Sequence, residues 1–269
     1  MIQALIHRES AHLIACGIYA AVAVLLLLIL RRIDSTWNPV LRGDGEGKSR
    51  GRVTLGQAAW EFVGIHSLQF LFAGLIASLV IRLALGGWTM WDAVILVGTI
   101  VVWPLQEWLG HVYLLHMKSF RLFGRTIEPV FIKTHRNHHR DVREPISGVV
   151  PTYFVAMYLL GLPFIWHIGL ALPQAFTGVT TSLVLLATYE WVHFLIHTSY
   201  KPRGRWYSSL WRNHRLHHFK NENCWFGVTT IVADVVLGTH PDQQLIGNSD
   251  TCLTLAAPEE HSLPGDETR

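Results

Sequence analysis

The chain has 269 residues, of which 50% are hydrophobic and only 15% charged, and its formal net charge at pH 7 is +3. This composition excludes an ordinary soluble domain and predicts a polytopic membrane protein. The three cysteines, Cys16, Cys224 and Cys252, lack CxxC spacing, so neither a disulfide framework nor a thiolate metal site is indicated.

The N-terminal region is predicted to hold one membrane anchor and one flexible loop. An apolar run from Ala11 to Leu30 has about the 20 residues that are needed to cross a bilayer. A signal peptide is the competing interpretation, but the run is longer than a typical signal core and its strongest charge, Arg31-Arg32, follows it. The polar, glycine-rich segment from Asp34 to Thr54 is predicted to form a flexible loop. We therefore expect residues 1–57 to form an uncleaved anchor and a loop.

Four further apolar stretches predict the remaining spans. They run from about Phe62 to Leu85, from near Asp92 into the first histidine cluster, from Val149 to Leu172, and from Ala175 onwards. The predicted fold is therefore all-α, a helical membrane bundle of four or five spans with a helical cap. Residues 58–240 would form one membrane-embedded unit, and the polar stretch 241–269 is expected to lack fixed structure.

The basic residues predict the orientation of this bundle. Twenty of the 22 Lys and Arg residues lie in the segments 31–54, 118–143 and 201–269, which follow the first, third and fifth predicted spans. Positive charge is retained on the cytoplasmic side of membranes, so these segments should be cytoplasmic and the N-terminus outside. The histidine clusters lie in or beside the same segments and should converge on the cytoplasmic face.

Ten of the sixteen histidines form four clusters. The clusters are His111 and His116; His135, His138 and His139; His193 and His197; and His214, His217 and His218. Residues three or four apart share one face of a helix, so three of the clusters each offer part of a metal site. His111 and His116 are five apart and do not share a face, so their helix should unwind or bulge if both are ligands.

Imidazole suits zinc, copper, iron and nickel, and the ten clustered histidines could supply about five ligands to each of two metal ions. A carboxylate often orients a metal-bound histidine through its second ring nitrogen, and the candidates are Glu107, Glu190 and Asp234. Glu107 and Glu190 would serve equally well as caps or ion pairs at the interface, and Asp234 as the partner of a basic residue. Of the other histidines, His240 is the strongest candidate because it follows the last cluster on the same side.

The four clusters, in this order on a polytopic chain, resemble the fatty-acid hydroxylase and sterol desaturase superfamily of non-haem di-iron membrane enzymes. The segments GHVYLLHMK, YEWVHFLIH and NENCWFGVTTIVADVVLGT are most similar to fatty-acid 2-hydroxylases, and the resemblance covers about Trp103 to Thr239. It implies that the ten histidines hold two iron ions, which zinc can replace in purified protein. It also implies O2-dependent hydroxylation of an acyl chain or related lipid, with desaturation of a sterol or another lipid as the alternative.

The same resemblance implies two partners, a membrane lipid as substrate and a separate electron donor. The donor would be a ferredoxin, or a cytochrome with its reductase, because the HPGG signature of a fused haem domain is missing and Asp242 follows His240-Pro241. No nucleic-acid partner is indicated, and the oligomeric state is left open. A bacterial inner membrane is preferred to the endoplasmic reticulum because the tail shows no retrieval signal.

A histidine-rich metal transporter is the competing function from another class. Its substrate path would need polar ligands near the middle of the membrane, and the spans offer few, with His66, Gln69 and His167 making no convincing path. A membrane cytochrome is disfavoured because HxxHH places three imidazoles on one side, whereas a haem needs one on each face.

Overall fold

The computed structural model describes residues 53–255 together with the isolated positions 17 and 21. The short helix α2 (Leu55–Val63) precedes the long helices α3 (His66–Leu85), α4 (Met90–Leu109), α6 (Thr152–His167) and α7 (Leu172–His197); the π-helix η1 (Gly110–Leu115) continues α4, and the 3-10 helix η2 (Pro145–Gly148) precedes α6. The remaining elements are the hairpin strands β1 (Phe120–Leu122) and β2 (Arg125–Ile127) and the helices α5 (Val130–Arg140), α8 (Arg205–Phe219) and α9 (Val232–Val236).

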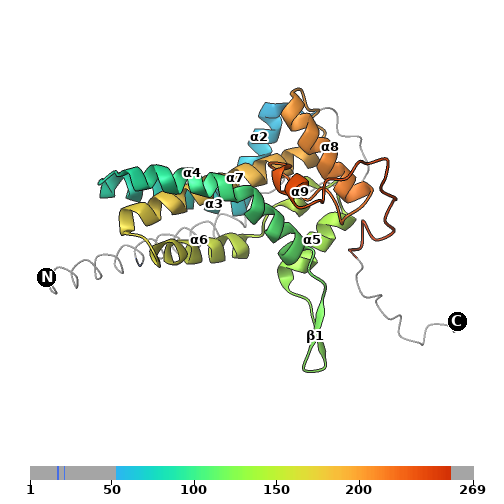
Figure 1. Cartoon of the computed structure of the whole chain (residues 1–269), viewed down its shortest axis with the longest axis horizontal. Helices are drawn as coiled ribbons and strands as arrows, with labels where there is room; N and C mark the ends of the chain where they lie inside the picture. The colour runs from blue at the N-terminus through green and yellow to red at the C-terminus, as the bar shows by residue number, and fades with distance from the viewer. Residues whose placement is uncertain (1–16, 18–20, 22–52, 256–269) are drawn as a thin grey trace.

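Four helical segments of the described residues are long and apolar enough to cross a membrane. They are α3, α4 with η1, η2 with α6, and α7. Figure 1 shows their helices running side by side along the long axis of the molecule. The predicted all-α membrane fold and four of its spans are thereby confirmed, with one short antiparallel hairpin as the exception to helix. The predicted first span and the loop after it lie almost entirely outside the described residues.

Local sequence signals fix where two of these helices begin. Thr54 and Gln57 form a reciprocal capping box at the start of α2, and Thr89 and Asp92 do the same for α4. Pro163 does not end α6, which continues to His167. A proline is tolerated inside a membrane helix when neighbouring groups satisfy the freed carbonyl.

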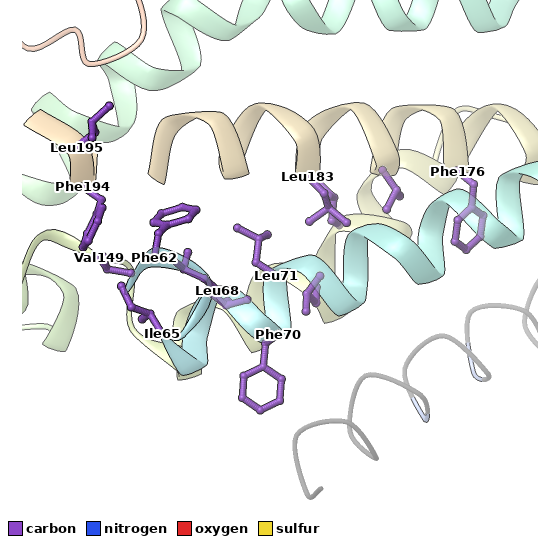
Figure 2. Packing of buried hydrophobic residues seen from close by; sticks show 14 of the residues in the cluster. Phe62, Ile65, Leu68, Phe70, Leu71, Val149, Phe176, Leu183, Phe194 and Leu195 are labelled. Carbon is purple, nitrogen blue, oxygen red and sulfur yellow. The ribbon is translucent and has the colours of Figure 1, made fainter. Parts of the chain in front are cut away.

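Helix α7 is the centre of the bundle and packs against α3, α4 and α6. Leu71 of α3 extends toward α7, where Leu183 lies, and both side chains are fully buried (Figure 2). The α3–α6 contact is equally close, because a Cβ added at Gly74 would lie 2.3 Å from a methyl group of Leu159. These contacts fix the position of α7, whose last turns carry His193 and His197.

At the end of the bundle far from the histidines, a buried polar cluster joins α3, α4 and α7. The Arg82 guanidinium lies 2.7 Å from Asp92 Oδ1 and donates to Thr177 Oγ1 at 2.7 Å. It also donates to the carbonyl of Gly86 and lies 3.5 Å from the centre of the Trp88 ring. A buried ion pair is tolerated only when such additional bonds offset its desolvation, so this cluster fixes the register of three spans.

The cap, which we define as α5, α8 and α9, gathers at the opposite end of the bundle (Figure 1). Residues 241–255, assigned by composition to an unstructured tail, lie against it. Cys252 is buried, and its carbonyl contacts the ring of His139. This part of the predicted tail therefore has a defined place in the structure, and residues 256–269 lie outside the described part.

Candidate dinuclear metal centre

The ten clustered histidines meet where the spans end and the cap begins, and they form two groups. The first histidine group is His111, His116, His135, His139 and His217, and the second is His138, His193, His197, His214 and His218. Within each group, one ring nitrogen from every member lies within 4.8 Å of all the others. The groups adjoin, because the rings of His139 and His218 are 4.2 Å apart between centroids. Each group thus has the size and donor set of a site for one metal ion.

Each HxxHH cluster is divided between the two groups. On α5, His135 and His139 belong to the first group and His138 to the second. Helix α8 is arranged the other way, with His214 and His218 in the second group and His217 in the first. Residues three and four apart lie on opposite flanks of one helix face, so a single face can supply ligands to two neighbouring sites.

A π-helix brings His111 and His116 together. The amide of His116 donates to the carbonyl of His111 at 3.0 Å, an i to i+5 hydrogen bond, and residues 110–115 form η1. The extra residue per turn returns the chain to the same face after five residues. The two rings are consequently 4.9 Å apart between centroids. The predicted bulge between these histidines is confirmed.

The outer nitrogens of six rings are held by fixed acceptors. In five of them Nδ1 donates to a backbone carbonyl: His111 to Phe226, His139 to Cys252, His193 to Gly148, His197 to Val142 and His217 to Cys224. In the sixth, Nδ1 of His138 donates to Ser147 Oγ. Donation from Nδ1 leaves the Nε2 lone pair facing the interior of the group.

The inward Nε2 atoms of five rings are buried without hydrogen-bond partners, as metal ligands would be. This holds among the described residues for Nε2 of His111, His135, His138, His139 and His193. Nδ1 of His214 and His218 is likewise unpartnered, while their Nε2 atoms face each other at 2.9 Å. Orphaned buried polar atoms are rare in proteins and are costly, and a cation in each group would satisfy the inward Nε2 atoms. The residues present therefore fit two metal ions.

The cap histidines are also in the protonation state that metal binding requires. Burial lowers the pKa of His139 to about 3, and it lowers the pKa values of His138 and His217 well below the usual value. Neighbouring histidines lower the pKa values of His138 and His217 further. Neutral imidazoles at pH 7 can take up a metal ion without first losing a proton.

The three candidate carboxylates accept hydrogen bonds from backbone amides and not from the histidine rings. Asp234 accepts hydrogen bonds from the amides of Phe226 and Gly227, at 3.0 Å and 2.7 Å. Glu107 accepts from the amides of Val228 and Thr229. These two carboxylates hold the loop whose Phe226 carbonyl accepts a hydrogen bond from His111, so they position this ring indirectly, through the loop.

Glu190 acts in the same way on the segment before α6. It accepts from the amide of Val150 at 3.0 Å, two residues after the carbonyl that bonds to His193. The sequence predicted that these carboxylates would contact the histidine rings. They instead accept hydrogen bonds from the loops whose carbonyls hold the rings. Sequence reasoning missed these carbonyls because any residue type can supply one.

Two glycines are required by close approach around the histidines. A Cβ at Gly148 would lie 2.7 Å from the His138 ring and 3.0 Å from the His193 ring. A Cβ at Gly227 would lie 2.0 Å from the backbone oxygen of Thr230. Of the remaining histidines, His240 lies near Asn213 and belongs to neither group.

A cavity of about 650 Å³ reaches the histidines from within the spans. It is lined by residues of α4, α6 and α7, and at one end by His111 and His135 of the first group and His193 of the second. Its size falls in the range of roughly 300–1,000 Å³ that is usual for ligand sites. Most of the wall away from the histidines is apolar, including Phe154, Leu162 and Leu186. The arrangement suits an apolar chain that presents one end to both groups.

Comparison with known proteins shows that the sequence of this chain is similar to those of fatty acid hydroxylases. The family model described as fatty acid hydroxylase matches residues 95–239. The dihydroceramide fatty acyl 2-hydroxylase FAH1 of Arabidopsis thaliana is 28% identical over 153 residues, which cover 55% of this chain and 60% of the relative. The fatty acid 2-hydroxylase of Homo sapiens is 29% identical over 162 residues, which cover 56% of this chain and 40% of the relative. The chain thus spans 60% or less of the length of these curated relatives.

A solved structure shows the same fold. The hydroxylase domain of full-length Scs7p aligns with a TM-score of 0.55 at 22% sequence identity, covering 66% of this chain and 69% of that chain. The curated ceramide very long chain fatty acid hydroxylase SCS7 of Saccharomyces cerevisiae is 30% identical over 151 residues, or 54% of this chain and 38% of the relative.

Proposed function

Because this chain belongs to the fatty acid hydroxylase family, we propose that it is a membrane lipid hydroxylase with one iron ion in each histidine group. The observation that carries the proposal is the cavity, which leads from the apolar interior of the spans to histidines of both groups. Two iron ions would supply O2 activation and hydrogen abstraction from an unactivated C–H bond. One O2, one C–H bond, two electrons and two protons yield one alcohol and one water.

The substrate proposed for this site is an acyl chain that is oxidised near its carboxyl-derived end. The histidines lie where the spans end, so they meet the part of a lipid closest to its headgroup. The apolar cavity wall receives the rest of the chain and excludes water from it. The relatives from Arabidopsis thaliana and Homo sapiens are named as 2-hydroxylases of fatty acyl groups, which supports the same position here.

The direct test of this function is isotopic. Purified protein in lipid nanodiscs is incubated with 18O2, a reductase system and either a dihydroceramide or the free fatty acid, and the products are fragmented by mass spectrometry. We expect one labelled oxygen atom on the carbon next to the carboxyl-derived carbon. An unlabelled double bond would favour a desaturase, and product formed without any reductant would contradict the oxygenase mechanism.

We place the histidine end of the bundle on the cytoplasmic side, because the basic segments 118–143 and 201–255 adjoin it. Single cysteines introduced at Phe123 and at Met90, in a chain without its native cysteines, test this placement. Both positions are exposed; Met90 is the first residue of α4, whereas Phe123 lies in the turn of the hairpin that follows the other end of the same span. An impermeant thiol reagent should reach Phe123→Cys from the cytoplasm and Met90→Cys from the other side; the reverse pattern would overturn the placement. The predicted bacterial membrane remains untested, and the eukaryotic relatives named above favour the endoplasmic reticulum instead.

An external donor is proposed to deliver the two electrons at α8. The inner face of this helix carries His214, His217 and His218. Its outer face exposes basic side chains, Arg205, Arg212 and Arg215. A helix is about 10 Å in diameter, so a donor bound there would be separated from both groups by little more than one helix. The positive charge favours an acidic donor such as a ferredoxin.

Reversal of charge on this face should weaken donor binding and leave the metal centre unchanged. With Arg212→Glu and Arg215→Glu together, we expect the second-order rate constant for oxidation of a reduced ferredoxin to fall about tenfold or more at low salt. Metal content should be retained, and the rate should lose most of its salt dependence. The control is Arg125→Glu, which changes an exposed basic residue of the hairpin; an equal loss in the control would argue against docking at α8.

A further inference from the structure

The cavity ends, on the side away from the histidines, at Trp166 of α6. Along α6 and α7, the lining residues farthest from the histidines are Trp166 and Ser182. The indole Nε1 of Trp166 donates to Ser182 Oγ at 3.2 Å. The ring therefore bridges α6 and α7 among the lining residues farthest from the histidines.

Helix α7 holds this ring in place. A Cβ added at Gly178 would lie 2.3 Å from Cδ2 of Trp166, so the indole rests directly on the backbone of α7. Gly178 and Ser182 are four residues apart and share one face of the helix. One contact and one hydrogen bond together restrict the rotamer of the ring, which makes it a fixed wall.

The depth of the cavity follows from helix geometry. Ser182 and His193, which line its two ends, are eleven residues apart on α7 and therefore roughly 16 Å apart along the axis. An extended chain advances roughly 1.2 Å per bond, since three backbone bonds of a polypeptide span at most about 3.6 Å. The space between histidines and indole consequently accommodates about 13 carbon atoms of an extended acyl chain.

We propose that Trp166 sets the acyl-chain length that this enzyme accepts. A chain with about 13 carbon atoms beyond the oxidised position fills the cavity, whereas a much longer chain meets the indole before its reactive carbon reaches the histidines. This inference rests on the proposed function for the position of the reactive carbon. The boundary itself rests only on the packing of Trp166 against Gly178 and Ser182.

The experiment uses full-length protein in nanodiscs that contain an equimolar ladder of dihydroceramides with saturated N-acyl chains of increasing length. Two quantities are measured by mass spectrometry: the chain lengths that remain bound after lipid exchange, and the chain lengths that become hydroxylated. Trp166→Ala should move both distributions toward longer chains by about four carbon atoms, because removal of the indole opens about one helical turn of 5.4 Å.

Two further variants keep the test decisive. Leu186 lines the cavity one turn closer to the histidines, so Leu186→Phe should shift both distributions toward shorter chains even if Trp166→Ala does not fold. Phe164→Ala is the matched control, because Phe164 lies two residues from Trp166 on α6, is 52% exposed and does not line the cavity. We expect no shift from this change.

Unchanged distributions in both Trp166→Ala and Leu186→Phe would overturn the proposal and indicate that the chain leaves the cavity sideways into the bilayer. A shift of the same size in the control would overturn it as well. Absence of hydroxylated product at every length would refute the proposed function instead, and the distribution of bound chains would still test the boundary.

Discussion

Replacement of His139 by alanine is expected to remove one metal ion from each chain and to lower lipid hydroxylation at least about 100-fold. His139 is fully buried, its Nδ1 is fixed by the carbonyl of Cys252, and its Nε2 has no partner among the described residues. The loss of one of five nitrogens should release the ion of the first histidine group. Elemental analysis of purified protein measures the metal content, and the labelled-product assay measures the activity.

Two further variants test the division into groups. His218→Ala should release the ion of the second group and leave that of the first, so the two variants should each keep about one ion, and the double variant none. His240→Ala is the control, since His240 follows the last cluster and lies outside both groups. Equal metal loss in the control, or retention of two ions in either variant, would refute the assignment of these residues as ligands.

Gly227→Ala is expected to release the metal ion of the first histidine group, as His139→Ala does, although it alters none of the proposed ligands. The added methyl group would lie 2.0 Å from the Thr230 backbone oxygen, which no side-chain movement can relieve. The loop must shift, and with it the neighbouring Phe226 carbonyl that holds His111. We expect a loss of roughly 1–3 kcal/mol of stability from the overpacking, together with loss of metal from the first group.

The matched control for this prediction is Gly98→Ala. Gly98 lies within α4, and a Cβ there would meet nothing within 4 Å. Alanine is also the better helix former, so the control should be neutral or slightly stabilising. Thermal unfolding followed by fluorescence, with metal analysis of the same samples, separates the two outcomes; a Gly227→Ala protein with normal stability and two ions would show that the loop is not constrained.

The sequence was informative wherever a single helix supplies the signal. Apolar runs of bilayer length predicted the four spans of the described residues, because each span buries its own backbone hydrogen bonds. The five-residue gap between His111 and His116 predicted a bulge, because a regular helix cannot place both rings on one face.

Features that depend on several helices were not predictable in the same way. Which of His138 and His139 joins which group depends on how α5 and α8 pack against the ends of the spans. The carbonyl of Cys252 is supplied by a polar segment whose composition favoured disorder. In the sequence, Trp166 cannot be told apart from other aromatic residues of the spans. Its role is indicated only by its contacts with Gly178 and Ser182 of α7 and by its place in the cavity lining.

The ten histidines form two adjacent groups of five, and we propose that each group binds one iron ion. Diffraction from crystals of protein loaded with iron, recorded on both sides of the iron absorption edge, tests it most directly. We predict two anomalous difference peaks per chain, one inside each histidine group and each surrounded by the Nε2 atoms of buried rings. A single peak shared by both groups, or peaks outside them, would contradict the claim.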